Sequence, residues 1–381
     1  MAPMTVPDDR ILDPRHYAAV RRPLARAQTL PAWCYTRPAF FQAEIERIFG
    51  TSWCFVGRRD ELAAVGDYVA LVSPLGPLIL VRDATDRVRA FANTCRHRGC
   101  EIVAGRGRTT GFVCPYHGWT YALDGRLLKA RHMEATEGFD RDAHGLIELQ
   151  TGEWDGFLFV AADPDAGSLQ DWLGDMPARF ASHDCVNLRC VDRVHYRIAC
   201  NWKLLLENAL EDYHTASVHR GSIGTQTATR EPTSGEWDSL YLETPEPVGT
   251  LPGIRSPFPA IATLEGVAKS RSYFTIVYPN TQFCFTQDCM WWLSVTPVSA
   301  DTSELDVGYC FPTATVARAD FANVAKEYFV RWKITTEEDI GVSERQQRGL
   351  ASPLRVSGPL SWKEELVNRF DRWVLDRVVP E

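Results

Sequence analysis

Two short segments that each combine a cysteine with a histidine constrain this chain more than any other feature. Cys95 and His97 are separated by one residue, and after sixteen further residues come Cys114 and His117, separated by two. Each pair lies in a glycine-containing segment between short stretches of alternating apolar residues. Two thiolates and two imidazoles are the ligand set of a 2Fe–2S cluster of mixed ligation. A Cys₂His₂ zinc site is the alternative, but zinc sites usually pair Cys with Cys and His with His. The mixed pairs favour the cluster.

Length, charge and cysteine content limit the partners and the compartment of the chain. Its 381 residues can bury a large core and are enough for two domains. With 41 basic and 49 acidic residues the net charge is −8, which argues against nucleic acid or an anionic membrane as partner. No apolar run approaches the ~18 residues of a membrane helix, and the first ten residues lack the apolar region of a signal peptide. Eleven cysteines without an export signal favour free thiols and metal ligands, so we expect a cytoplasmic protein.

The first half of the chain changes character near residue 52. Residues 17–50 have a roughly helical pattern, with an amphipathic helix expected at 40–49. From about 52 to 163, short alternating stretches are separated by Gly, Pro and Asp turns, which predicts a small all-β domain. The clearest expected strands are 67–71, 78–82 and 88–92.

The second half mixes helices and strands from about residue 191 onward. A helix is expected from Trp202 to Tyr213 and a long one from about Ala317 to Gln347. The region 220–270 is rich in Gly, Thr, Pro and Ser, and we expect it to form loops. The expected strands are 273–277, 282–285, 290–295 and 305–311.

Two histidines and one carboxylate in this second half are candidate metal ligands. His214 and His219 are five residues apart, which on an ideal helix separates them by about 140°. Both can therefore face one metal only if the helix ends near Thr215. The pattern alone is weak, because a histidine is more often a hydrogen-bonded structural residue.

The long helix expected at 317–347 carries a carboxylate on its apolar face. Residues at spacings of three and four place Asp339 on that stripe, whereas Glu338 is expected to face solvent with Arg331 and Arg345. A buried carboxylate is costly unless it is paired or binds a metal. A salt bridge or a helix-end hydrogen bond is the plain alternative. Two histidines and one carboxylate would leave positions on an iron open for O₂ and substrate.

The chain resembles the α-subunits of Rieske non-haem iron oxygenases. The resemblance covers most of residues 40–375 and rests on four segments, Cys95–Gly99, Cys114–Trp119, 201–219 and 338–350. Rieske proteins of respiratory complexes carry an additional cysteine in each loop, and the two are joined as a disulfide. Here Cys100 matches the first, but Tyr116 stands where the second would be. The oxygenase branch is therefore favoured.

The resemblance implies two cofactors and an α+β fold. A 2Fe–2S Rieske cluster would be held by Cys95, His97, Cys114 and His117, and a mononuclear Fe(II) by His214, His219 and Asp339. An all-β Rieske domain, residues 51–163, would be inserted beside an α+β catalytic domain, residues 164–381, built on an antiparallel sheet covered by helices. Residues 1–50 would form a helical segment that packs with the catalytic domain.

The implied activity is that of a terminal oxygenase that uses O₂ and electrons from NAD(P)H. The chain has no Gly-x-Gly-x-x-Gly fingerprint, so a flavin- or iron–sulfur-containing reductase, with or without a ferredoxin, would handle the nicotinamide. We expect a homotrimer in which one subunit's cluster serves the iron of its neighbour. A Rieske electron-transfer protein without oxygenase activity is the alternative of another class, but it does not explain Asp339. A zinc-stabilised binding module would be colourless.

The resemblance also assigns Glu211 and Asn208 to catalysis. Glu211 would link a cluster histidine of one subunit to His214 of the next, and on a helix it would lie on the same side as His214. A surface salt bridge, with Asp212 taking the inward position, is the plain alternative.

The expected substrate follows from the glutamate at position 211. Many ring-hydroxylating members carry aspartate there, whereas glutamate is similar to the branch that oxidises carnitine and glycine betaine. We therefore expect hydroxylation or oxidative demethylation of a small quaternary amine, with ring hydroxylation of an aromatic compound as the alternative. Aromatic residues that could surround a trimethylammonium group, unless they are ordinary core residues, are Phe283, Phe285, Trp291 and Trp292.

Overall fold

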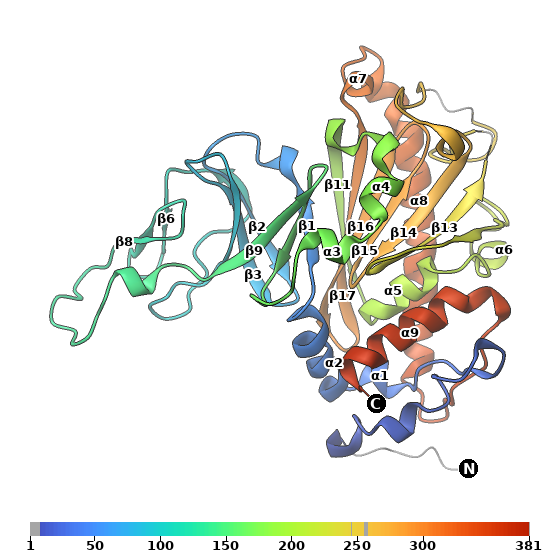
Figure 1. The fold of residues 1–381 in the computed structure, drawn as a ribbon, viewed down its shortest axis with the longest axis horizontal. Helices are drawn as coiled ribbons and strands as arrows, with labels where there is room; N and C mark the ends of the chain where they lie inside the picture. Colours follow the sequence, from blue (N-terminus) through green and yellow to red (C-terminus); the bar gives the residue numbers. More distant parts are fainter. Residues whose placement is uncertain (1–7, 245, 255–257, 381) are drawn as a thin grey trace. The chain divides into compact units, whose positions relative to one another are not determined.

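Two separate seven-stranded antiparallel sheets divide the chain into two units (Figure 1). The structure is a computed structural model that describes residues 8–244, 246–254 and 258–380. One unit joins the N-terminal segment up to Phe49 to the chain from Gln170 onward, and the other runs from Gly50 to Leu169. Helices concentrate in the first unit and the second is built from strands, in agreement with the predicted α+β class.

The unit from Gly50 to Leu169 is an all-β structure. Its larger sheet has the strand order β1-β10-β9-β4-β3-β2-β5, and a small sheet has the order β6-β7-β8. The strands expected at 67–71, 78–82 and 88–92 are present as β2, β3 and β4. The strands are β1 Cys54–Arg58, β2 Asp67–Ser73, β3 Gly76–Arg82, β4 Val88–Ala92, β5 Arg106–Arg108, β6 Phe112–Val113, β7 Thr120–Tyr121, β8 Leu127–Lys129, β9 Glu148–Trp154 and β10 Phe157–Ala161.

The other unit is built on a sheet of order β11-β17-β16-β15-β14-β13-β12. The four strands expected between 273 and 311 are present as β14 to β17. The expectation of loops throughout 220–270 is wrong, because β13 pairs with β14 and β12 pairs with β13 at the edge of the sheet. The local sequence does not signal β14 as a partner. The strands are β11 Leu188–Ile198, β12 Thr229–Glu231, β13 Trp237–Glu243, β14 Arg271–Val277, β15 Thr281–Phe285, β16 Met290–Ser299 and β17 Thr302–Pro312.

The longest helix, α8, runs along this sheet (Figure 1). Its Trp332 ring packs 4.6 Å from the ring of Tyr309 on β17 and 5.2 Å from that of Trp291 on β16. In the described ranges no helix is both long and apolar enough to cross a bilayer. The helices are α1 Trp33–Thr36, α2 Pro38–Glu44, α3 Leu169–Leu173, α4 Met176–Arg179, α5 Trp202–Ala209, α6 Thr215–Val218, α7 Thr313–Val316, α8 Phe321–Leu350 and α9 Glu365–Val378, and a π-helical turn, Ile45–Phe49, continues α2.

A buried ion pair attaches the N-terminal segment to α5. Lys203 Nζ lies 2.5 Å from Glu44 Oε1, and both side chains are fully buried. The same ammonium group donates to the Cys34 carbonyl at 2.8 Å and to Asn201 Oδ1 at 2.8 Å, so its three protons all have acceptors. A buried charge pair with complete hydrogen bonding holds its two elements in one arrangement.

Candidate metal centres

Two similar loops present the four residues expected to hold the cluster. Cys95 and Cys114 are buried, whereas His97 and His117 are exposed, and the two Nδ1 atoms lie 3.2 Å apart. Gly99 and Gly118 have φ of 72° and 69°, and each donates its backbone N–H to the carbonyl of the loop cysteine. That left-handed conformation favours glycine, and it folds each loop back on itself. Two buried thiols and two facing imidazoles fit the ligand set of a Rieske cluster.

Two aromatic residues that the sequence analysis did not single out support these loops. The Tyr121 hydroxyl accepts a hydrogen bond from the backbone N–H of Arg96 at 3.0 Å and lies 3.3 Å from Cys95 Sγ. The Trp119 ring stacks on His97 with 5.0 Å between centroids and 10° between planes. Both lie within four residues of His117, a position that could have marked them as part of the site.

The second candidate centre depends on a break in the helix before His214. The helix expected at 202–213 ends at Ala209, and the chain forms one further helical turn, α6, with His214 at its start and His219 at its end. Glu211 Oε2 accepts the His214 backbone N–H at 2.9 Å, a local bond that competes with helix continuation. The helix thus ends earlier than the expected position near Thr215, and the two histidines lie at opposite ends of the single turn α6.

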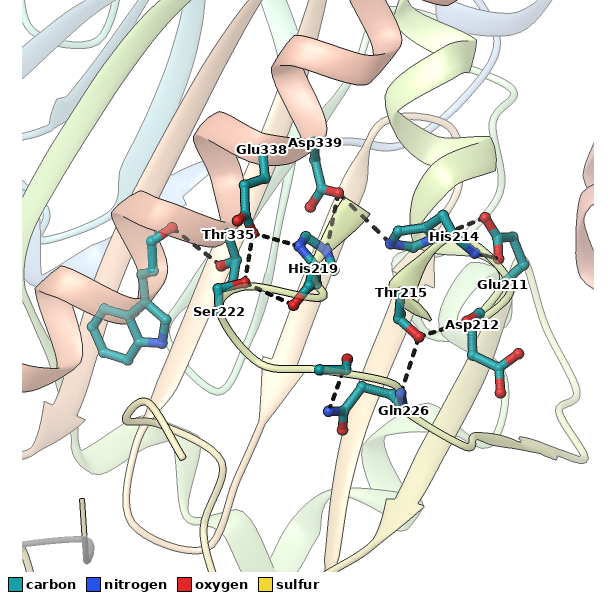
Figure 2. Close-up of polar contacts among 12 residues, drawn as sticks. Glu211, Asp212, His214, Thr215, His219, Ser222, Gln226, Thr335, Glu338 and Asp339 are labelled. Carbon is teal, nitrogen blue, oxygen red and sulfur yellow. Dashed lines mark hydrogen bonds and ion pairs between the residues drawn. The ribbon is translucent and has the colours of Figure 1, made fainter. Parts of the chain in front are cut away.

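His214, His219 and Asp339 come together at one point, as Figure 2 shows. Asp339 Oδ1 lies 3.1 Å from His219 Nε2 and 3.6 Å from His214 Nε2. The ligand atoms of the three residues all lie within 4.8 Å of one another. Asp339 Oδ1 is buried and has no hydrogen-bond partner among the described residues. A metal ion would satisfy this oxygen.

A second carboxylate holds each histidine from the opposite side (Figure 2). His214 Nδ1 lies 2.7 Å from Glu211 Oε1, and His219 Nδ1 lies 2.7 Å from Glu338 Oε2. Because an ionised carboxylate can only accept, each Nδ1 carries the proton, and the Nε2 lone pairs point towards Asp339. Two oriented imidazoles and one carboxylate are the facial triad that binds non-haem Fe(II).

The electrostatics around His219 favour a cation at the same place. Burial opposes the charged form, but the neighbouring Asp339 and Glu338 carboxylates outweigh it and raise the pKa of His219. Without a metal, a proton on Nε2 would supply the positive charge next to Asp339. A bound metal ion would supply it instead.

Two expectations for α8 are wrong. Glu338 does not face solvent, because it accepts hydrogen bonds from His219 and from Ser222 Oγ, at 2.6 Å for the latter. Arg331 is only 4% exposed, whereas Arg345 is exposed as expected. The buried face of α8 is wider than a single apolar stripe because the sheet, α5 and α6 all pack against this helix.

A largely apolar cavity of about 130 Å³ adjoins the three candidate ligands. Asn208 and Glu211 line it, together with the two histidines and Asp339. Leu205, Ile223, Leu240, Leu242, Leu293, Val295, Leu305 and Ile340 supply much of its apolar wall.

Of the four aromatic residues proposed for an ammonium site, only Trp291 lines this cavity. Side chains alternate along β15 and β16, so Phe283, Phe285 and Trp292 belong to the opposite face of the sheet and are fully buried. On that face the Trp292 ring covers Gly308, where a Cβ atom would lie 2.0 Å from the ring. Phe274 on β14 is a lining aromatic that the sequence analysis missed.

Comparison with known families decides the assignment. Residues 52–140 match the Rieske 2Fe-2S domain, and residues 186–379, half of the chain, match the family described as ring hydroxylating alpha subunit (catalytic domain). The chain belongs to this family. The Rieske match contains both Cys–His loops, and the catalytic match contains His214, His219 and Asp339.

Several named oxygenases of the family are similar to this chain. The oxygenase subunit of carnitine monooxygenase from Escherichia coli (strain K12) is 37% identical over 220 residues, 56% of this chain and 59% of that protein. The chloroplastic choline monooxygenase of Beta vulgaris is 28% identical over 362 residues, 91% of this chain and 76% of that protein. A crystal structure of a quaternary ammonium Rieske monooxygenase in complex with L-carnitine superimposes with a TM-score of 0.77 at 26% identity, covering 98% of this chain and 99% of that one.

Membership of the family confirms the predicted pair of cofactors, a Rieske 2Fe–2S cluster and one mononuclear iron. The residues present fit both groups. Four residues in two loops offer two thiolates and two imidazoles, and the triad offers an orphaned carboxylate oxygen with two oriented imidazoles. The assignment of individual ligands is our proposal.

Proposed function

We propose that this chain is the terminal oxygenase component of a system that hydroxylates or oxidatively demethylates a small quaternary amine. The observation that carries the proposal is the triad, His214, His219 and Asp339, which lies in the wall of a largely apolar cavity. The substrate would occupy the cavity, and a separate reductase, with or without a ferredoxin, would deliver electrons from NAD(P)H. The nine cysteines outside the two Cys–His pairs form no disulfide, which supports a reducing, cytoplasmic location.

The cofactors would supply electron storage in the cluster and O₂ activation at the mononuclear iron. The chain's residues position these groups and the substrate. Glu211 and Glu338 fix the tautomers of the two ligand histidines, and a two-histidine, one-carboxylate set leaves several iron positions open. The apolar wall excludes water from the reacting carbon. We assign Asn208 a substrate-positioning role, because its amide lines the cavity and can both donate and accept a hydrogen bond.

The relatives and the cavity together support a quaternary amine. Two relatives are named for carnitine and choline. Glu211 and Asp339 place negative charge near the candidate metal site, and Phe274 and Trp291 line the same cavity. Carboxylates and aromatic rings are the groups that stabilise a trimethylammonium cation. The family description favours ring hydroxylation as the second candidate, and an electron carrier would need neither the triad nor the cavity.

A substrate panel tests the proposal. Carnitine, γ-butyrobetaine, glycine betaine and choline should stimulate coupled NADH and O₂ consumption and yield a hydroxylated or demethylated product. Naphthalene and benzoate should not. Product analysis by mass spectrometry is required, because uncoupled O₂ consumption would mimic turnover. Turnover of the aromatic compounds alone would replace the proposal with the second candidate.

We further propose that Glu211 connects the iron site to the cluster of a neighbouring subunit in a trimer. The helical argument for this contact is wrong, since Glu211 lies after the end of α5, but the carboxylate does reach His214 Nδ1. Glu211→Gln should keep both metal centres and the trimer, yet slow re-oxidation of the reduced cluster by about tenfold or more, the scale of losses next to metal ligands. Single-turnover stopped-flow on pre-reduced protein measures this rate.

Two neighbouring variants complete the test. Glu211→Asp should retain part of the rate, because the charge stays and only its reach shortens. Asp212→Asn should be close to wild type, because Asp212 pairs with Lys363 Nζ at 2.8 Å and accepts from the Ala228 N–H at 2.8 Å. A slow Asp212 variant beside a normal Glu211→Gln variant would transfer the connecting role to Asp212.

A further inference from the structure

The cavity contains one buried cation that forms no ion pair with a described residue. Arg331 is 4% exposed, and it is the only lysine or arginine among the described residues that line the cavity. Within the described part of the chain its Nε has no hydrogen-bond partner and its guanidinium group forms no ion pair, although the negative charge of Asp339 acts on it at longer range. A buried arginine without a counter-charge is costly, so the structure holds it there at the expense of stability.

The groups around Arg331 hold it in place without neutralising it. Its guanidinium lies 5.0 Å from the centroid of the Trp291 ring, a cation–π contact that fixes its position at the cavity wall. Burial raises the pKa of the nearby Cys284 and Cys289 thiols well above their usual range, so both are neutral. Burial also lowers the pKa of Arg331 to about 10, which leaves the guanidinium charged at neutral pH.

Arg331 and the candidate iron site lie along the same helix. Three residues of α8 that follow one another at intervals of four line the cavity, namely Arg331, Thr335 and Asp339. Eight residues of α-helix rise about 12 Å, so the backbone positions of Arg331 and Asp339 are about two turns apart. The cavity therefore carries negative charge near Asp339 and Glu211 and positive charge near Arg331.

We propose that the Arg331 guanidinium binds a carboxylate of the substrate. The preferred substrate is then a zwitterion, with its ammonium group towards Asp339 and its carboxylate on Arg331, rather than a quaternary amine with a neutral tail such as choline. Arginine suits this role because its planar fork binds a carboxylate through two parallel hydrogen bonds. The orientation of the zwitterion rests on the proposed function, whereas the carboxylate site itself does not.

Calorimetric titration of the holoprotein with matched acids and amides tests the proposal. γ-Butyrobetaine and its primary amide have the same shape and differ in the charge at the Arg331 end. The wild type should bind the acid about tenfold or more tightly than the amide, the scale of a charged hydrogen-bonded pair. Arg331→Met should bind acid and amide equally, with the affinity for the amide unchanged from the wild type. Arg331→Lys should retain part of the preference for the acid. Arg345→Met, on the exposed side of the same helix, should behave as wild type.

A second ligand pair separates this proposal from the proposed function. Benzoate and benzamide carry the same acid-to-amide change without an ammonium group. One outcome is that the wild type prefers the acid in the benzoate pair but not in the γ-butyrobetaine pair, and that Arg331→Met loses this preference. That result supports the carboxylate site and removes the quaternary-amine assignment. A second outcome is that the protein turns over quaternary amines but both Arg331 variants still prefer the acid to the amide. That result overturns the carboxylate site and leaves the proposed oxygenase function standing. Equal binding of acid and amide by the wild type, in both pairs, also overturns it.

Discussion

Asp339→Ala is expected to remove the mononuclear iron and abolish substrate oxidation, while the cluster stays intact. Asp339 is the only carboxylate in the triad, and its Oδ1 faces both Nε2 atoms. Without it two neutral imidazoles remain, too few ligands to hold Fe(II). Iron should fall from about three to about two atoms per chain, because the cluster holds the other two. Iron analysis together with the visible spectrum of the cluster measures both centres in one sample.

The two residues that precede Asp339 provide graded controls. Glu338→Ala should weaken iron binding by roughly 10- to 100-fold, because it releases His219 Nδ1, the usual scale for a partner of a metal ligand. Glu337→Ala should have no effect on iron, since that side chain is exposed and forms an ion pair with Lys333 on the helix surface. Iron retained by the Asp339 variant and lost from the Glu337 variant would show that α8 presents another face to the metal.

Cys114→Ser is expected to remove the cluster, with its visible absorbance, labile sulfide and ability to accept electrons. The Cys114 thiol is buried in the loop opposite Cys95, and serine offers a poor ligand to iron. The mononuclear iron should remain at about one atom per chain, because the proposed triad shares no residue with the cluster loops.

Cys100→Ser is the matched control for this experiment. Cys100 lies beside the first loop, but its thiol contacts the Glu101 carbonyl at 3.2 Å and belongs to neither Cys–His pair. Its variant should keep the full cluster spectrum. A spectrum that survives Cys114→Ser and disappears in Cys100→Ser would require a different ligand set.

Features with strong local patterns were predictable from the sequence. The Cys–His loops are marked by their residue types, and their glycines match the left-handed turns that the loops require. The strands β14 to β17 alternate clearly, and the periodicity of α8 placed Asp339 at an inward position among apolar residues. In each case the residues that form the pattern lie within about twenty positions of one another, and the geometry of the strand or helix fixes which of them share a face.

Features that depend on distant partners or on one local bond were not predictable. The end of α5 follows from a hydrogen bond between the Glu211 carboxylate and the His214 N–H, which periodicity cannot register. Glu338 looked like a solvent residue because its partner His219 is more than one hundred residues away in the chain. Arg331 looked like a surface cation because nothing in α8 reveals that the sheet covers it. The proposed aromatic cage failed for a related reason, since alternation along a strand does not say which face holds the cavity.

The Glu44–Lys203 pair has a consequence for how the protein can diverge. A lone charge left at either position would cost about 3–5 kcal/mol, a large share of the ~5–15 kcal/mol that holds a typical domain folded. A substitution at one of the two positions is therefore tolerated only if the other position changes with it. One partner lies in the first fifty residues and the other beside the proposed iron-binding segment, so a change in one region requires a matching change in the other. A chimera that exchanges the N-terminal segment between family members should fold only where both parents carry compatible partners.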